Sequence, residues 1–491
     1  MSHPTARARR LSSLAFAALI ASAPSAAAQT AHSAGKVPIS TASAEAKTDF
    51  IKGRTLAENL RAHESREFLR QAVAKDPGFA LAHLNLANSA PTAKEFFEHL
   101  GHAVALAGKA SPGERLMILG AQAGANGDPA KQLEQYQQLV AEFPQDERAH
   151  FLLGGTYFGQ QDYDKAIEEY RRATAIAPDF APAYNIMGYA YRTAGRYPEA
   201  EAAFEKYIEL IPNDPNPYDS YAELLMKMGR FDQSIAQYRK ALEVNPQFAP
   251  SFLGIASNLA LQGKYDASRS EARKLHDSAR NDGEKRAAMF AVTTTYAEEG
   301  KFDLALAELD KQYAMGKRIG DAAAMAGDAT FMGNVLLESG KPAEALKKFE
   351  HALQVTEASQ LSAEVKENAK LFHRFNVARV AIATKDLATA KREGEAFLRE
   401  SQARKNSFQV RLGHEVAGRI ALEEKNYDGA LAHLEQANQQ DPYNLYRMGL
   451  AYEGKGDSAK AKEMFLSAAE FNQLPTLNSA FVRAKTRKLK A

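Results

Sequence analysis

Among the residues that could do chemistry, the first group lies in the segment EFFEHLGH at 95–102. Glu95 stands four residues before His99, and Glu98 stands four residues before His102. Residues at this spacing share one face of a helix, and imidazole and carboxylate groups are both zinc ligands. A metal site would need further ligands from elsewhere in the chain. A solvated helix face explains the same spacing, and we predict no metal site.

A second group consists of Asp219 and Glu223, which also stand four residues apart. Two carboxylates on one helical face can act as general acid and base if their surroundings separate their pKa values. Asp219 follows the proline-rich segment NDPNPY at 213–218, so we place it in a first helical turn. The helix dipole favours a negative charge there. We therefore expect recognition or helix stabilisation at this pair rather than catalysis.

The rest of the chain carries no nucleophile elbow, Walker loop, dinucleotide fingerprint or paired-histidine zinc motif. Its 12 histidines are scattered, and it has no cysteine, which excludes disulfides, thiolate nucleophiles and cysteine metal ligands. The absence of cysteine is also compatible with an oxidising compartment. The sequence predicts a protein that is not an enzyme and has no catalytic residue, cofactor or metal.

A step of 34 residues organises the sequence between residues 113 and 280. Small, mixed, aromatic and proline positions recur at this step: Gly120, Gly154, Gly188, Ala222 and Ala256; Ala123, Tyr157, Tyr191, Leu225 and Leu259; Tyr136, Tyr170, Phe204 and Tyr238; Pro144, Pro178, Pro212 and Pro246. A fixed period of this length is typical of a solenoid of helical hairpins. Such a chain builds an extended curved surface.

The small residues have a packing role in this interpretation. Gly154 and Ala166, and one step later Gly188 and Ala200, would let the two helices of a hairpin approach closely. Glycine inside a helix costs about 1 kcal/mol relative to alanine, so close packing is the expected reason for its presence. The proline that follows the second helix cannot continue it.

The pattern resembles the tetratricopeptide repeat family in its leucine-glycine, tyrosine, alanine, phenylalanine and proline positions. The tryptophan usual near the start of that repeat is replaced by His150, Tyr184, Tyr218 and Phe252, because the chain has no tryptophan. The resemblance covers most of residues 46–475. It implies an all-α fold, a right-handed superhelical solenoid of antiparallel helix hairpins, of which we expect about eleven.

Each hairpin of such a solenoid stacks on its neighbours, so we expect one continuous body. The expected segments are degenerate helical repeats at 46–112, regular 34-residue repeats at 113–280, looser repeats at 281–475 and a basic C-terminal capping helix at 476–491. We expect the irregular steps to be absorbed by longer connections near 276–285, 313–325 and 356–368.

The N-terminus has the features of a secretory signal. Three arginines precede an apolar run at 11–23 and a small-residue stretch at 26–28, which predicts a signal peptide at 1–28. The alternative, an uncleaved anchor, is disfavoured because the run is shorter than the ~20 residues of a membrane span. Residues 29–45, rich in Ala, Ser and Thr, are expected to form a flexible leader. We predict export to the periplasm or the exterior, without stable membrane insertion after signal removal.

The charge balance argues against a nucleic-acid partner. The chain has 62 Lys and Arg against 60 Asp and Glu, or a net charge of +2. The predicted signal carries three arginines and no acid, so its removal leaves a net charge of −1. Nucleic-acid-binding proteins usually show a basic excess. Only residues 483–490 are locally basic, and we interpret them as the solvated face of the capping helix.

In this family the first helix of each pair lines the concave groove. The resemblance therefore implies a partner-binding surface formed by Phe151, Phe158, Asn185, Tyr189, Arg192, Asp219, Glu223, Met226 and Lys227. Aromatic anchors mixed with both signs of charge suit an extended peptide or a partner helix. The Lys and Asn clamp with which one subgroup holds a C-terminal carboxylate is missing, because its positions hold Phe151 with Gly155, Asn185 with Tyr189, and Asp219 with Glu223.

The sequence thus predicts an exported, non-enzymatic scaffold that binds a protein or peptide of unknown identity along its concave face. The alternative is a hydrolase or metal-dependent enzyme whose site is spread over several repeats.

Overall fold

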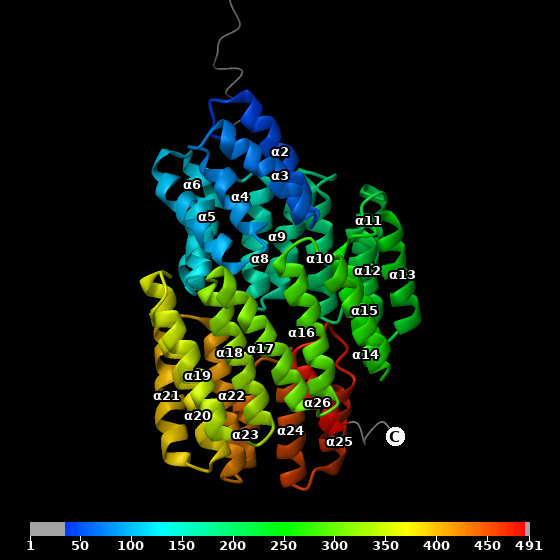
Figure 1. The fold of residues 1–491 in the computed structure, drawn as a ribbon, viewed down its shortest axis with the longest axis vertical. Helices are drawn as coiled ribbons and strands as arrows, with labels where there is room; N and C mark the ends of the chain where they lie inside the picture. The colour runs from blue at the N-terminus through cyan, green and yellow to red at the C-terminus, as the bar shows by residue number, and fades with distance from the viewer. Residues whose placement is uncertain (1–34, 487–491) are drawn as a thin grey trace, which may run out of the picture.

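The computed structural model describes residues 35–486. The predicted signal peptide, the first part of the predicted leader and residues 487–491 lie outside this range. Within it the chain forms 25 α-helices, one short 3-10 helix and no strand. Consecutive helices associate in antiparallel pairs, which confirms the predicted all-α solenoid (Figure 1).

Twelve helix pairs follow one another along the described chain, and a single helix follows the last pair. The first six pairs are α2 (Ala44–Glu58) with α3 (Ala62–Lys75), α4 (Ala80–Asn88) with α5 (Ala93–Leu106), α6 (Pro112–Ala125) with α7 (Pro129–Glu142), α8 (Glu147–Gly159) with α9 (Tyr163–Ile176), α10 (Ala181–Thr193) with α11 (Tyr197–Leu210), and α12 (Asn216–Lys227) with α13 (Phe231–Val244). The 3-10 helix η1 (Ala107–Lys109) follows α5.

The second six pairs include the longest helices. They are α14 (Ala249–Leu261) with α15 (Tyr265–Ser278), α16 (Asp282–Glu298) with α17 (Phe302–Ile319), α18 (Ala322–Glu338) with α19 (Pro342–Glu357), α20 (Ala363–Ala383) with α21 (Leu387–Ala403), α22 (Ser407–Glu423) with α23 (Tyr427–Leu434), and α24 (Pro442–Gly454) with α25 (Ser458–Ala469). The final helix is α26 (Leu477–Thr486).

The expected number of hairpins was one too small, because the α20–α21 pair was missed. Helix α20 contains no glycine, and the small residue sixteen positions before Phe397 is Ala381, so this pair lacks the glycine that marks most other pairs. The expected long connections near 313–325 and 356–368 were also wrong. The first helices α16, α18, α20 and α22 begin 40, 41 and 44 residues apart, and the added residues lengthen the helices instead of the loops.

The predicted close approach within a hairpin is present. A methyl group added at Gly188 in α10 would lie 2.7 Å from the ring of Phe204 in α11. The equivalent addition at Gly154 in α8 would lie 2.6 Å from the ring of Tyr170 in α9. Both rings are fully buried. Glycine at these positions therefore lets a large aromatic side chain of the second helix rest against the backbone of the first.

The later repeats pack back onto the first ones. The side-chain amide of Asn406, just before α22, donates to the carbonyl oxygen of Gly127 at 3.0 Å. Arg411 in α22 donates to the carbonyl oxygen of Gln160 at 3.1 Å. Figure 1 shows the helices from α16 to α26 below the helices from α2 to α10. The superhelix is thus closed by contacts between repeats far apart in sequence.

The described part of the expected flexible leader lies against the first repeats. The backbone N–H of Val37 donates to Asp146 at 2.9 Å, and that of Ser40 donates to Glu114 at 2.8 Å. Lys36 forms an ion pair with Glu147 at 2.7 Å. Acidic residues at the starts of α6 and α8 therefore hold residues 36–40 as an extended strap, which differs from the flexible segment expected.

Helix α26 covers the last pair, as a capping helix does, and also contacts α16 and α18 across the superhelix. Phe481 and Val482 are buried. Arg483 donates to Glu298 at 2.9 Å, and Lys485 forms an ion pair with Glu338 at 2.6 Å. The described basic residues of this helix are thus paired with acids of α16 and α18, whereas we had expected a solvated face.

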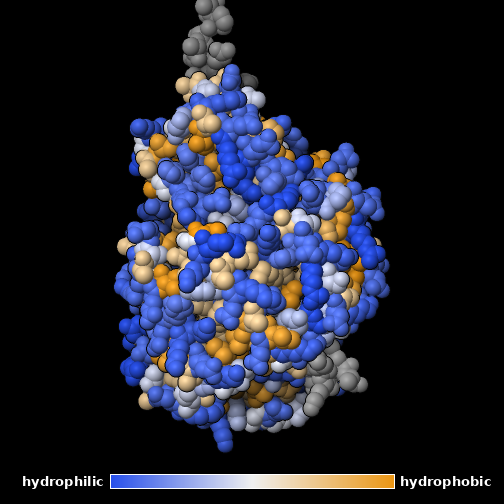
Figure 2. All heavy atoms as spheres, in the orientation of Figure 1, coloured by the Kyte–Doolittle hydropathy of each residue, from blue (hydrophilic) through white to orange (hydrophobic). Residues whose placement is uncertain are grey.

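Figure 2 shows that hydrophilic residues cover most of the face seen in Figure 1, with hydrophobic residues emerging in separate patches between the helices. Among the helices of residues 35–486, none is long and apolar enough to cross a membrane.

The close approach in the hairpins can be tested with a matched pair of glycines. We expect Gly188→Ala to lower the free energy of unfolding by about 1–3 kcal/mol, because its methyl group meets the Phe204 ring. Gly327 also lies inside a helix, α18, but a methyl group there has no atom within 4 Å. Gly327→Ala should raise stability by up to about 1 kcal/mol. Chemical denaturation measures both, and equal shifts would contradict the packing account.

Candidate functional site

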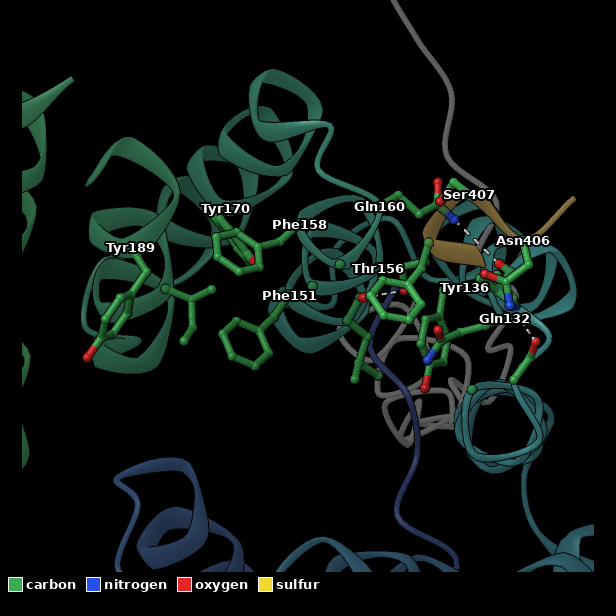
Figure 3. A pocket seen from close by; sticks show the side chains of 18 of the residues that line it. Gln132, Tyr136, Phe151, Thr156, Phe158, Gln160, Tyr170, Tyr189, Asn406 and Ser407 are labelled. Carbon is green, nitrogen blue, oxygen red and sulfur yellow. Dashed lines mark hydrogen bonds between the residues drawn. The ribbon is translucent and has the colours of Figure 1, made fainter. Parts of the chain in front are cut away.

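A hollow lies along α6, α8 and α10. Its volume is about 700 Å³. Its walls carry aromatic, amide and small residues, with one arginine: Gly124, Gly127, Pro129, Gln132, Tyr136, Phe151, Leu152, Gly155, Thr156, Phe158, Gly159, Gln160, Tyr170, Ile186, Tyr189, Arg192, Asn406, Ser407 and Phe408. Figure 3 shows Tyr136, Phe151, Tyr170 and Tyr189 spread along one side of it. We call this hollow the central groove.

A second hollow of about 520 Å³ adjoins the central groove toward α4. The two share Gly124, Gln132, Tyr136, Phe151 and Leu152 as lining residues. The second hollow is lined by apolar side chains of α4, α6 and α8, including Leu81, Leu84 and Met117, and by charged side chains that are largely paired with one another: Lys36, Arg54, Glu58, Asp146, Glu147 and Arg148. The strap residues Val37 and Ile39 close one side of it. Together the hollows form one trough along four consecutive repeats.

Four of the nine predicted partner-binding residues line the central groove: Phe151, Phe158, Tyr189 and Arg192. All four are half-buried. The ring of Phe151 lies 5.9 Å from that of Tyr170 and 5.5 Å from that of Phe180, so it is held in place by neighbouring aromatic rings. Phe158 contacts Tyr163 at 5.6 Å between ring centroids. The aromatic surface is therefore built before any partner binds.

Tyr189, Arg192 and Glu223 form one polar cluster at the end of the groove. The hydroxyl of Tyr189 donates to Glu223 at 2.9 Å, and the guanidinium of Arg192 donates to the other oxygen of that carboxylate at 3.0 Å. Arg192 also lies over the Tyr189 ring, 4.6 Å from its centroid. Burial and the negative Glu223 raise the pKa of the Tyr189 hydroxyl, which stays a neutral donor. The charges of Arg192 and Glu223 thus neutralise each other.

Asn185, Asp219 and Met226 are buried, at 3%, 4% and 0% exposed. Contrary to the surface position expected of them, these side chains support the groove wall from behind. Asp219 accepts a hydrogen bond from the Ser251 hydroxyl at 2.7 Å. Burial, and secondarily the charge of Glu223, raises the pKa of Asp219 to about 8. The carboxylate pair considered for acid–base chemistry therefore has one member out of reach of a substrate and the other bound to Arg192.

Lys227 lies beside the chain's own C-terminal segment. Its ammonium group is 3.6 Å from the centroid of the Phe471 ring, in the connection between α25 and α26. Burial, with the nearby charge of Arg192, lowers the pKa of Lys227 to about 8. Residues 471–486 thus cover the inner side of the superhelix from α12 to α18, and the trough over α4–α10 is the part they leave open.

Three groove residues come from the other end of the chain and were not predicted. Asn406, Ser407 and Phe408 at the start of α22 also line the central groove. Figure 3 shows Asn406 and Ser407 near Gln132 and Gln160. The Phe408 side chain is 46% exposed. The sequence showed only an aromatic residue next to a helix start. It could not indicate the contact with α6 and α8, because that contact depends on closure of the superhelix.

The histidines considered as metal ligands do come together. The ring of His83 in α4 lies 5.8 Å from His99 and 5.2 Å from His102 in α5. Burial lowers the pKa of His83 and of His99, so both favour the neutral form. Glu95 instead pairs with Arg70 at 3.6 Å. Over residues 35–486, no group of three His, Cys, Asp or Glu side chains has the geometry to hold a metal ion.

Comparison with known proteins now identifies the repeats. Sequence profiles of the tetratricopeptide repeat match residues 122–180, 191–259 and 442–473. The chain is a tetratricopeptide repeat protein. The matched segments contain α7–α9, α11–α13, most of α14, and α24–α25. They include Phe151, Phe158 and Arg192 of the central groove, whereas Tyr189 lies between two matched segments. A search of curated proteins finds no match.

Several solved structures have similar helical repeats. MamA (residues 41 to the end) from Desulfovibrio magneticus RS-1 is 14% identical, with 34% of this chain and 96% of that one covered and a TM-score of 0.29. TTC0263, a thermophilic tetratricopeptide repeat protein of Thermus thermophilus, is 21% identical, with coverages of 44% and 99% and a TM-score of 0.29. A tetratricopeptide repeat protein of Parabacteroides merdae ATCC 43184 is 15% identical, with coverages of 67% and 98% and a TM-score of 0.33. These likenesses concern the fold alone.

The buried carboxyl of Asp219 predicts a specific dependence of stability on pH. An exposed aspartate titrates near pH 4, whereas Asp219 in the folded chain keeps its proton up to about pH 8. Its contribution to stability is therefore complete below about pH 4 and is lost as the pH rises toward 8. Asp219→Asn keeps an acceptor for Ser251 and removes this loss. We expect the variant to be more stable than the wild type at pH 8–9, by about 1–3 kcal/mol, with a smaller difference at pH 5.

Thermal and chemical unfolding between pH 5 and 9 measure this difference. Asp303, whose side chain is 93% exposed, provides the control, and Asp303→Asn should leave the pH profile of the wild type unchanged. If the profiles of Asp219→Asn and the wild type run parallel, the buried, protonated state of Asp219 is ruled out.

Proposed function

We propose that this protein is a non-enzymatic, exported scaffold that binds a segment of a partner protein in the trough over α4–α10. Tetratricopeptide repeats form a fold that is typical of protein-interaction scaffolds. The observation that carries the specific proposal is the open aromatic trough, which is preformed and spans four repeats. Grooves of this kind bind extended segments or helices through side-chain anchors set into hydrophobic pockets.

The lining favours a partner segment with apolar or aromatic anchors. Half-buried aromatic rings such as Phe151, Phe158 and Tyr189 offer large contact areas at low entropic cost, as the anchor residues of protein interfaces do. The amide side chains of Gln132 and Asn406 can hydrogen-bond to a peptide backbone. Because Arg192 is already paired with Glu223, the groove has no free charge that would demand an oppositely charged residue.

The same pairing limits what Asp219 and Glu223 can recognise. Two exposed acids on one helical face would attract a basic segment. With Asp219 buried and Glu223 engaged by Arg192 and Tyr189, neither carboxylate is available to a cationic residue. The proposed partner is therefore recognised by shape and apolar contact, with backbone hydrogen bonds at the amide groups.

Export is part of the proposal and rests on the N-terminal sequence. The arginines, the short apolar run and the alanine stretch within residues 1–28 have the order and lengths of a secretory signal. Secretion would place the scaffold in an oxidising compartment, in which a chain without cysteine forms no unwanted disulfide.

Site-specific photo-crosslinking in the native host tests where the partner binds. A photoreactive residue at Phe158 or Phe408 should capture the same partner, because the two positions face one groove from distant parts of the chain. The same probe at Leu304, an exposed hydrophobic residue of α17 outside the groove, is the control. The double variant Phe158→Ala with Phe408→Ala should weaken capture from a third groove position, Gln132, at least tenfold.

Capture that is equal at Leu304 and in the groove, or unchanged in the double variant, would place the interface elsewhere. Fractionation of the host with an antibody to residues 35–486 tests export separately, and recovery of the protein with its N-terminus intact in the cytoplasm would reject it.

A further inference from the structure

Three arginines meet on the inner side of the C-terminal repeats, away from the trough. Arg379, Arg419 and Arg447 come from α20, α22 and α24, the first helices of three successive pairs. Their alignment follows from the repeat, since equivalent positions of stacked first helices face the same side. None of them contributes to the trough over α4–α10.

One carboxylate, that of Glu415, pairs with two of the three guanidinium groups. Glu415, 5% exposed, lies 3.0 Å from Arg447 and 3.8 Å from Arg419. Arg379 instead donates to the neutral amide oxygens of Asn334 at 2.8 Å and Asn376 at 3.2 Å. A buried charge needs both a counter-charge and hydrogen bonds to offset the loss of water. Arg419 has only the longer ion pair among the contacts of the described residues.

The other charged groups nearby are already engaged. Lys485 of α26 pairs with Glu338 at 2.6 Å, and Tyr443 donates to the same carboxylate at 2.7 Å. Asp441 accepts from Asn478 at 2.6 Å, and burial together with Glu415 raises its pKa, which disfavours its negative form. Glu423, on the rim, pairs with Lys385. The centre of the cluster therefore carries an excess of positive charge.

The excess of positive charge affects the pKa of the Arg419 guanidinium. Burial, with the charges of Arg447 and Arg379, lowers its pKa to about 9, far below the usual value for arginine. A bound anion would reverse this effect, because an opposite charge nearby stabilises the protonated form.

A hollow of about 450 Å³ opens beside Arg419. Arg447 and Lys485 also line it, and three tyrosines, Tyr427, Tyr443 and Tyr446, form part of its wall. The hydroxyl of Tyr443 already donates to Glu338, so Tyr427 and Tyr446 supply the hydroxyl donors of this wall. The guanidinium fork matches two oxygens of a carboxylate or phosphate. The hollow is therefore suited in size, charge and donor groups to a single oxyanion carried on a larger ligand.

We propose that the hollow beside Arg419 is a binding site for an oxyanion, the carboxylate or phosphate group of a ligand that enters the inner side of α22–α26. Arg419 is the residue that contacts the anion. Arg447 and Lys485 raise the positive electrostatic potential in the hollow. Their side chains are held in place by ion pairs with Glu415 and Glu338, respectively. The site is independent of the proposed trough, so either assignment can fail without the other.

Isothermal titration calorimetry on the chain from residue 29 tests this proposal, with inorganic phosphate and acetate as separate probes at constant ionic strength in chloride. We expect saturable binding of at least one probe, weakened tenfold or more in Arg419→Gln. Arg419→Lys keeps the charge and should retain part of the affinity. The control is Arg399→Gln on α21, which removes the same charge from a side chain that is 71% exposed and should bind like the wild type.

Binding of phosphate alone would indicate a phosphorylated ligand, and binding of acetate alone a carboxylate ligand. Absence of saturable binding for both probes would overturn the proposal, as would an equal loss of affinity in Arg419→Gln and Arg399→Gln, which would indicate only a nonspecific charge effect. Circular dichroism of each variant establishes that it is folded before titration.

Discussion

Seven of the twelve described hairpins share one contact, between a glycine of the first helix and a large side chain sixteen positions later in the second. Gly154 with Tyr170 and Gly188 with Phe204 show it in the regular repeats, and Gly449 with Phe465 shows it near the C-terminus. The aromatic ring lies on the bare helix backbone, which brings the two helix axes close. Hairpins held by this contact have similar distances between their two helix axes. Successive first helices therefore stack in register, and their inner faces form a continuous wall. The trough and the arginine cluster are both consequences of that register.

The inner wall is used differently along its length. Over α4–α10 it is open and aromatic, over α12–α18 it is covered by the chain's own residues 471–486, and over α20–α24 it is strongly basic. One repeat architecture thus presents three surfaces, which differ in the side chains of the first helices and in the C-terminal segment that covers the middle one. This division gives one solenoid two separate candidate binding surfaces, the trough and the basic cluster.

The sequence predicted the parts of the fold that local spacing controls. The glycine, aromatic and proline columns placed the hairpins of residues 113–280, and slot positions within them placed Phe151, Phe158, Tyr189 and Arg192 in the groove. It missed α20–α21, whose first helix lacks the glycine signal, and it placed Met226 on the surface although that side chain is buried. Phe408 and the strap at 36–40 could not be predicted, because their neighbours are set by closure of the superhelix and are more than 70 residues away in sequence.

Closure also changes how the protein must assemble. An open solenoid can fold repeat by repeat, since each unit needs only its neighbours. Here Asn406 bonds to Gly127, Arg411 to Gln160 and Arg483 to Glu298. These contacts join segments 279, 251 and 185 positions apart, so they form only after most of the chain has emerged. Until α22 arrives, the central groove lacks the wall formed by Asn406, Ser407 and Phe408. A chain that emerges N-terminus first therefore passes through an incomplete stage in which the apolar lining of the groove is open to nonspecific contacts. Folding of the last quarter of the sequence ends that stage.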